Sequence, residues 1–216
     1  MPKRRKLSNP LALAVLVTLQ ERPRHPYDVG RVLRHRGKHH SIKINYGSLY
    51  TVVRNLEKHG FVETSDVERQ GNRPERTLYR LTPAGRAELH DWLSELVAVP
   101  AKEFPLFESA LSLLPALPAD EAIALLGQRL AALEEQAAGM QGELEKWSGL
   151  LPRLVLIEAE FQLHRIRAEA AWVREFHAEL EQGSFEGIAQ WREMGRTGGV
   201  PEELQRLEEH LDQDRT

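Results

Sequence analysis

The sequence of 216 residues contains no cysteine, which excludes a disulfide framework, thiolate chemistry and a cysteine-based metal site. No apolar run approaches the roughly 18 residues that a membrane-spanning helix requires. The first ten residues, MPKRRKLSNP, lack the apolar stretch of a secretory signal. We therefore expect a soluble, cytoplasmic protein that has no membrane partner.

Common catalytic motifs are also missing. The sequence has no glycine-rich phosphate loop, no zinc-type histidine pair on an acidic helix and no nucleophile elbow. We therefore expect no enzymatic activity, no cofactor and no metal. The composition, 41% hydrophobic and 28% charged, is that of an ordinary globular protein.

Charge is distributed unevenly along the chain, although the net charge is only −3. Residues 1–100 hold 18 Lys and Arg against 10 Asp and Glu, for a net charge of +8. Residues 101–216 hold 11 against 22, for a net charge of −11. A basic half of this kind indicates a polyanionic partner, and the acidic half indicates self-association or solvation.

The first 44 residues predict two helices and a short strand. Asn9-Pro10 is a typical helix start, and the apolar run that follows to Leu19 predicts a helix buried on most sides. Pro26 can open a second helix that ends near Gly37. Ile42 to Ile44 alternates apolar and polar residues, which favours a brief strand.

The stretch from Asn45 to Val62 predicts the central helix of this half. Asn45 is a suitable N-cap, and Leu49, Val53 and Leu56 fall on one helical face. The remaining surface carries hydroxyls, amides, an aromatic ring and cations, from Ser48, Tyr50, Thr51, Arg54, Asn55 and Lys58. Such a face can meet a phosphate backbone and present donors to base edges.

A β-hairpin and a fourth helix follow. Residues 61–67 and 77–81 alternate as strands, and the turn between them carries Gly71, Asn72 and Pro74. Thr82-Pro83 then begins a helix. This order of elements predicts a winged helix-turn-helix domain at residues 1–98.

The acidic half shows two heptad seams. The first comprises Leu126, Leu130, Leu133, Ala137, Met140, Leu144 and Trp147, and the second comprises Leu156, Ala159, Leu163, Ile166, Ala170, Val173, His177 and Leu180. They predict a mostly α fold with an antiparallel two-helix coiled coil at residues 105–183. The second helix has a further apolar face at Ile157, Phe161, Trp172 and Phe176, which a second copy of the chain would cover.

Residues 184–216 form a less regular tail. Gly195, Gly198 and Gly199 suggest a mobile connection before a short helix striped by Leu204, Leu207 and Leu211.

Several motifs of the basic half resemble the PadR family of bacterial transcription regulators. They are His25-Pro-Tyr-Asp-Val29, Gly47-Ser48-Leu49-Tyr50, Leu56-Glu57 with Gly60, and Leu78 to Thr82 with Gly85 and Trp92. The family usually has glycine where Pro26 stands. The long C-terminal helices are similar in pattern to the dimerisation part of longer PadR-like proteins, which include virulence gene activators.

The resemblance implies a homodimeric winged-helix regulator, most often a repressor, that binds a roughly palindromic DNA operator. It implies that residues 45–58 form the recognition helix and that the hairpin tip forms the wing. The DNA contacts predicted from the residues and the resemblance together are Lys43, Asn45, Tyr46, Ser48, Tyr50, Thr51, Arg54, Arg69, Asn72, Arg73 and Arg76. The predicted dimer interface is Leu156, Phe161, Leu163, Ile166, Trp172, Val173 and Phe176.

Two alternative functions remain open at this point. Some PadR-like regulators stack planar ligands on tryptophans of the helix after the wing, so Trp92 is either a core residue or part of a site for a multidrug or phenolic effector. The other alternative is a coiled-coil adaptor with an inert winged helix, against which the charge of +8 on residues 1–100 argues.

Overall fold

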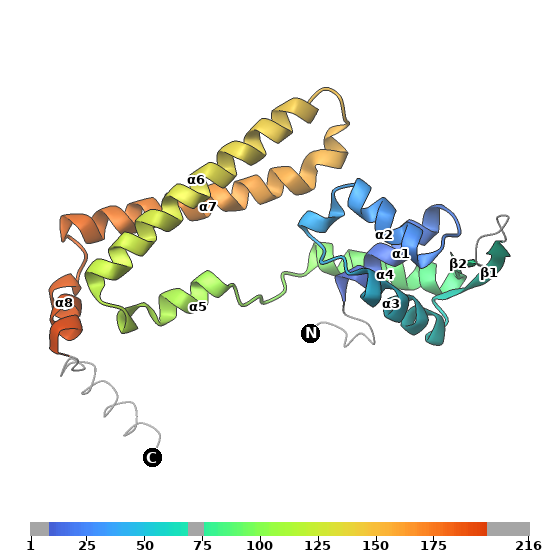
Figure 1. The fold of residues 1–216 in the computed structure, drawn as a ribbon, viewed down its shortest axis with the longest axis horizontal. Coiled ribbons are helices and arrows are strands. Elements are labelled where there is room, and N and C mark those ends of the chain that lie inside the picture. Colours follow the sequence, from blue (N-terminus) through green and yellow to red (C-terminus); the bar gives the residue numbers. More distant parts are fainter. Residues whose placement is uncertain (1–8, 69–75, 198–216) are drawn as a thin grey trace, which may run out of the picture. The chain divides into compact units, whose positions relative to one another are not determined.

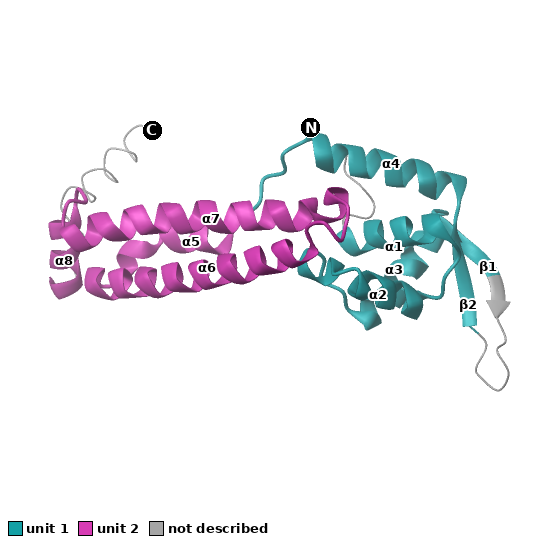
Figure 2. Cartoon of the chain, turned by 90° about the horizontal axis from the view of Figure 1, so that it is seen from above, with its two compact units in different colours: residues 1–103 teal, residues 104–216 magenta. Residues whose placement is uncertain are grey.

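The structure, a computed structural model, describes residues 9–68 and 76–197. The chain divides into two compact units, residues 1–103 and residues 104–216 (Figures 1 and 2). The first is a winged helix-turn-helix unit and the second is built on a pair of long helices. The predicted fold class, mostly α with a small antiparallel sheet, is confirmed.

Unit 1 packs four helices with one β-hairpin. Its elements are α1 (Pro10–Glu21), α2 (Pro26–His35), a 3-10 turn (Lys38–His40), α3 (Tyr46–Lys58), β1 (Val62–Glu68), β2 (Arg76–Leu81) and α4 (Pro83–Ala98). Helix α1 lies at the centre, in contact with α2, α3, α4 and β2. Its apolar sequence therefore reflects burial on several sides.

Side-chain caps set where three of these helices begin. Asn9 Oδ1 accepts a hydrogen bond from the Leu11 amide at 2.9 Å, and Asn45 Oδ1 accepts one from the Gly47 amide at 2.9 Å. Thr82 Oγ1 accepts one from the Gly85 amide at 3.0 Å. Each bond satisfies an N–H that has no partner within the first turn of the helix.

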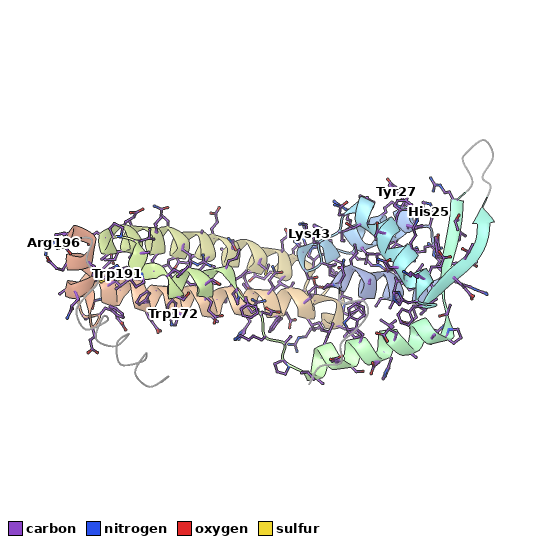
Figure 3. All side chains as sticks on the ribbon, turned by 90° about the horizontal axis from the view of Figure 1, so that it is seen from below. His25, Tyr27, Lys43, Trp172, Trp191 and Arg196 are labelled. Carbon is purple, nitrogen blue, oxygen red and sulfur yellow. The ribbon has the colours of Figure 1, made fainter. Side chains whose placement is uncertain are left out.

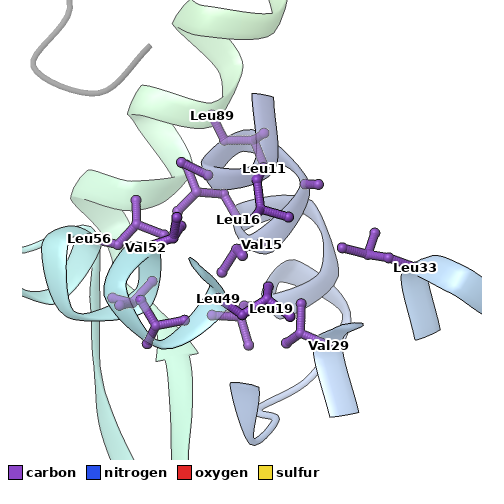
Figure 4. Close-up of a cluster of buried hydrophobic side chains, with 14 of the residues drawn as sticks. Leu11, Val15, Leu16, Leu19, Val29, Leu33, Leu49, Val52, Leu56 and Leu89 are labelled. Atoms are coloured by element: carbon purple, nitrogen blue, oxygen red, sulfur yellow. The ribbon is translucent and has the colours of Figure 1, made fainter. Parts of the chain in front are cut away.

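The core of unit 1 is formed by aliphatic side chains from all four helices (Figure 4). Val15 and Leu16 of α1 and Leu49 and Leu56 of α3 are fully buried. Because one face of α3 is buried in this core, the opposite face of the helix must lie at the surface.

Gly85 allows the first turn of α4 to approach the segment between α3 and β1 closely. A Cβ added at this residue would lie 1.9 Å from the Phe61 carbonyl oxygen, a distance that no side chain can tolerate. Thr82 reinforces the junction, because its Oγ1 donates to the Gly60 carbonyl at 2.7 Å. Gly60 itself has a φ of 73°, in the left-handed region that favours glycine after a helix.

Strands β1 and β2 pair antiparallel, from Val62 opposite Leu81 to Glu68 opposite Arg76, with an irregularity between Thr64 and Asp66. An isolated bridge adds the segment between α1 and α2 to the same sheet. In this bridge the amide of Arg24 donates to the Tyr79 carbonyl, and the amide of Tyr79 donates to the Arg24 carbonyl, each at 3.0 Å.

The predicted strand at residues 42–44 is wrong. The segment has no strand pairing, and the bridge beside β2 is made by Arg24 instead. Ile44 is buried at 8% exposure, so its apolar side chain fills the core from a loop. Arg34 NH2 fixes this loop by donating to the Ile44 carbonyl at 3.1 Å. Alternation over three residues cannot distinguish such an anchor from a strand.

Unit 2 is a helical hairpin with short helices at one end. Its elements are α5 (Leu106–Ser112), a 3-10 turn (Leu114–Ala116), α6 (Ala119–Trp147), α7 (Arg153–Gln182) and α8 (Ile188–Thr197). Figure 2 shows α6 and α7 side by side along most of their length. Arg174 contacts Glu134 at 2.7 Å and Arg167 contacts Gln141 at 3.0 Å, an order that fits antiparallel helices.

Helix α8 corrects the expected mobile connection, because Gly195 lies inside it. Ile188 and Trp191 are buried against the hairpin, and Trp191 Nε1 donates to the Leu117 carbonyl at 2.9 Å. The predicted stripe of Leu204, Leu207 and Leu211 lies outside the described residues. Within the described ranges, no helix is both long and apolar enough to cross a membrane.

Candidate nucleic-acid interface

Helix α3 has one face in the core and the other at the surface. The predicted core residues Leu49, Val53 and Leu56 are each 2% exposed or less, and Val52 joins them at 7%. The outer surface of the helix carries exposed hydroxyl, amide and cationic groups, with one carboxylate, Glu57, near its end; the others are Tyr50, Thr51, Arg54, Asn55 and Lys58. The helix can therefore enter a groove without giving up its core contacts.

The start of α3 is held firmly against α2. Tyr46 stacks on Tyr27 with ring centroids 5.3 Å apart, and the Arg34 guanidinium lies 5.1 Å from the centroid of the Tyr46 ring. Gly30 permits this approach, since a Cβ there would lie 2.6 Å from Leu49 Cδ1. Tyr46 is half-buried and has this packing role, whereas Tyr27 is 47% exposed.

His25 links the start of α2 to the exposed face of α3. Its Nδ1 accepts a hydrogen bond from the Tyr27 amide at 3.2 Å, and its ring meets Tyr50 edge-on with centroids 5.9 Å apart. Burial lowers the pKa of His25, and Arg76 lowers it further, while Asp28 acts in the opposite direction. The neutral ring, which alone can accept at Nδ1, is therefore favoured.

The base of the wing is connected to α2 by Asp28. One oxygen of this carboxylate lies 3.2 Å from Arg31, and the other lies 3.9 Å from Arg76 of β2. Arg76 is exposed, so it remains accessible to a partner.

Helix α3 also contacts the hairpin, because Thr64 Oγ1 of β1 donates a hydrogen bond to Glu57 Oε1 at 3.1 Å. The pKa of the Tyr79 phenol is raised by burial and then by Glu57, while Arg54 lowers it. The side chains of Glu57 and Arg54 thus act electrostatically on Tyr79 of β2. The other predicted wing contacts, Arg69, Asn72 and Arg73, lie outside the described residues.

Three further predicted contacts gather before and within the first turn of α3. Lys43 is exposed in the preceding loop, Asn45 is the N-cap and Ser48 is half-buried. Figure 3 shows Lys43 apart from His25 and Tyr27 on unit 1. The predicted DNA contacts that the structure describes thus extend along the length of α3 and to the base of the wing.

The residues predicted for the dimer interface fall into two groups. Leu163 and Val173 are buried within the chain itself, at 5% and 0% exposure, so they stabilise the hairpin. Phe161 and Trp172 are 64% and 46% exposed and remain available to a partner. The half-buried members are Leu156, Ile166 and Phe176.

Trp92 belongs to the core of unit 1. It is 4% exposed and part of the same cluster as Leu89 and the aliphatic residues of α1. This is the core interpretation of the residue, and a ring so covered has no free face on which a planar ligand could stack.

Sequence reasoning gave no DNA-binding role to His25 and Arg34, two residues that support this interface, although His25 belongs to one of the PadR-like motifs. His25 immediately precedes a proline at a helix start, which is the position of an N-cap. That signal could have identified the cap. The pairing of Tyr27 with Tyr46 depends on the angle between α2 and α3, which a sequence pattern does not give.

The fold and this surface define a class: a winged helix-turn-helix followed by a long helical hairpin. Residues 15–91 match the Transcriptional regulator PadR-like family. The Negative transcriptional regulator PadR of Bacillus subtilis (strain 168) is 28% identical over 137 residues, which cover 63% of this chain and 74% of that relative. The resemblance predicted from the sequence is thereby confirmed, and residues 15–91 form a PadR-like domain.

Solved structures show the same fold. The chain is similar to Bacillus subtilis PadR in a crystal structure with operator DNA, with a TM-score of 0.63 and 23% identity over 83% of this chain and 99% of that one. A crystal structure of Bacillus subtilis PadR with p-coumaric acid matches with a TM-score of 0.62 and 22% identity, over 79% of this chain and 98% of that one.

Proposed function

We propose that this chain is a sequence-specific transcriptional repressor that binds a roughly palindromic DNA operator as a homodimer. The observation that carries the proposal is the exposed face of α3, where Tyr50, Thr51 and Arg54 stand opposite fully buried leucines. A helix fixed in this way can present a guanidinium, a hydroxyl and a ring to the major groove.

The charge of unit 1 and the relatives support this proposal. Residues 1–100 carry a net charge of +8, which favours association with a polyanion at low salt. The similar Bacillus subtilis protein is described as a negative transcriptional regulator, and one of its structures contains operator DNA.

Exposed apolar side chains of unit 2 support the homodimer. Leu154, Phe161 and Trp172 of α7 are 78%, 64% and 46% exposed, and the hairpin has no further helix in the described residues to cover them all. A second copy of α7 would bury these groups, and a homodimer would place two recognition helices on one duplex.

The test is a selection of preferred duplexes by the wild type and by Tyr50→Phe, Tyr50→Ala and Arg54→Ala, each first shown by thermal melting to be folded. If Arg54 reads guanine, its loss reduces discrimination at that base pair by about 1–3 kcal/mol. A phosphate contact would instead weaken binding without altering the preference. If all three variants retain the affinity and preference of the wild type, α3 is not the reading helix.

A second proposal concerns an effector. The similar Bacillus subtilis regulator has a structure with p-coumaric acid, a phenolic carboxylic acid, which favours the effector alternative. In this chain the buried Trp92 does not offer a stacking surface. A titration of the purified chain with p-coumaric acid, followed by tryptophan fluorescence and by release of DNA, tests whether such an effector acts here.

The adaptor alternative makes a different prediction. An inert winged helix would not bind duplex DNA or heparin at low salt. A DNA-binding winged helix would be retained on a heparin column at low salt and would elute as the salt concentration rises. Retention of the wild type on heparin, lost at high salt, would therefore support the regulator over the adaptor.

A further inference from the structure

A polar groove runs beside the recognition helix, between the starts of α1 and α3. Its volume is about 430 Å³, and the buried residues Ala12 and Val52 are part of its lining. Its polar lining comes from Asn9, Asn45, Gly47, Ser48, Thr51 and Asn55. None of these eight described residues is Asp or Glu.

The lining is rich in hydrogen-bond donors. Asn9 and Asn45 each use the side-chain oxygen to cap a helix, at 2.9 Å from the amides of Leu11 and Gly47. Their Nδ2 groups remain donors, and Ser48 and Thr51 add hydroxyls. A concave surface with many donors and no carboxylate suits a group that has several acceptor oxygens and a negative charge.

The surroundings of the groove point to the same ligand chemistry. The first turns of α1 and α3 contain no acidic residue, so the positive ends of both helix dipoles are not neutralised locally. In the sequence, Lys3, Arg4, Arg5 and Lys6 precede Asn9 by only a few residues. The groove is also continuous with the exposed face of α3, through Thr51 and Asn55.

We propose that this groove seats a backbone phosphate of the DNA strand that flanks the bases read by α3. Asn9 and Asn55 are then DNA-binding residues, and Ser48 and Thr51 contact the backbone instead of base edges. The inference rests on the proposed function, and it assigns the part of the interface that sets the position of α3 on the duplex. Such contacts fix register and carry no sequence information directly.

The sharpest test places a carboxylate in the groove without disturbing the fold. Asn9→Asp preserves the cap, because Asp and Asn are equally good N-caps, and its charge is favourable at a helix start. Asn55→Asp introduces the same charge from α3, at an exposed residue that is not a cap. A carboxylate within a few ångströms of a phosphate should weaken binding about tenfold at 0.1 M salt.

Gln20→Glu is the matched control, because it makes the same amide-to-acid change at an exposed residue near the other end of α1. The two positions are about 16 Å apart along the helix, beyond the Debye length of about 10 Å at 0.1 M salt. All variants are measured as the full chain, by thermal melting and by titration of a duplex that the wild type selects from a random pool.

We expect both groove variants to melt like the wild type, to bind about tenfold more weakly and to select the same sequence, while Gln20→Glu binds normally. Wild-type affinity in both groove variants would overturn the groove assignment, and so would a changed sequence preference or an equal loss in Gln20→Glu. The proposed function fails separately, if the wild type selects no duplex or if Arg54→Ala and Tyr50→Ala have no effect.

Discussion

The two units treat apolar side chains in different ways. In unit 1 the large apolar residues of α1 and α3 are mostly buried within the unit, and the face of α3 that remains at the surface is polar and cationic. In unit 2 the hairpin buries one seam but leaves Leu154, Phe161 and Trp172 exposed on α7. The exposed face of unit 1 is thus suited to a hydrated, charged partner, and the exposed face of unit 2 is suited to an apolar partner surface.

Charge follows the same division. The basic half of the sequence coincides with the winged helix, and the acidic half coincides with the hairpin. A strongly acidic unit 2 would be repelled by DNA, so the distribution favours binding through unit 1.

The largest effect is expected from Gly85→Ala, because the new Cβ would collide with the Phe61 carbonyl oxygen, whose backbone cannot move freely. We expect unit 1 to lose about 3 kcal/mol of folding free energy or more, together with DNA binding. The control is Gly142→Ala in α6, which has open space around it and should stabilise the helix by about 0.5–1 kcal/mol. Melting curves and a duplex titration measure both; similar effects would contradict the close contact.

The exposed face of α7 gives the next prediction. Phe161→Glu combined with Trp172→Glu should convert the dimer to monomer, because charged groups cannot be buried in an apolar interface without a large cost. Sedimentation at micromolar concentration measures the change, and Gln136→Glu at an exposed site on α6 is the control. A wild type that is already monomeric under these conditions would remove the basis of the homodimer.

A smaller effect is expected at the base of the wing. Arg76→Ala should weaken binding to all duplexes alike and lower the magnitude of the salt slope by about 1, because one phosphate contact is lost. Arg80→Ala is the control and should have a smaller effect, because the Arg80 guanidinium of β2 is already paired with Glu63 of β1 at 2.8 Å. Unchanged affinity and slope in Arg76→Ala would show that this arginine serves only the ion pair with Asp28.

The smallest effect concerns pH. The pKa of His25 is lowered in the folded state, so the unfolded chain binds the proton more readily. Its contribution to stability is therefore complete above the unfolded value of 6.5 and is lost as the pH falls below it toward the lower folded pKa. His25→Asn retains a capping side chain but does not titrate, so it should reduce the dependence of the melting temperature on pH below the unfolded value of 6.5.

Local signals predicted much of unit 1. Asn9, Asn45 and Thr82 each precede a helix as capping residues do, and the spacing of Leu49, Val53 and Leu56 gave the buried face of α3. These features depend on neighbours along the chain, which is why a sequence pattern contains them. The exposed face of α3 follows from the same spacing.

Features that depend on packing between distant segments were not predictable. Arg24 pairs with β2 because α1 and the hairpin are adjacent in space, and Ile44 is buried from a loop. Helix α8 contains Gly195, which is unfavourable for a helix. The helix is held in place by the buried Trp191, whose Nε1 donates a hydrogen bond to the Leu117 carbonyl. The groove between α1 and α3 likewise joins Asn9 to Asn55, which are far apart in the sequence.

Site selection from random duplexes with the full chain tests whether two copies of unit 1 read DNA while unit 2 holds them together. We expect an inverted repeat whose half-site centres are about 10 base pairs apart, or a multiple of that spacing, because recognition helices of a dimer meet successive major grooves. Enrichment of no sequence, or of a single half-site bound by one chain, would contradict it.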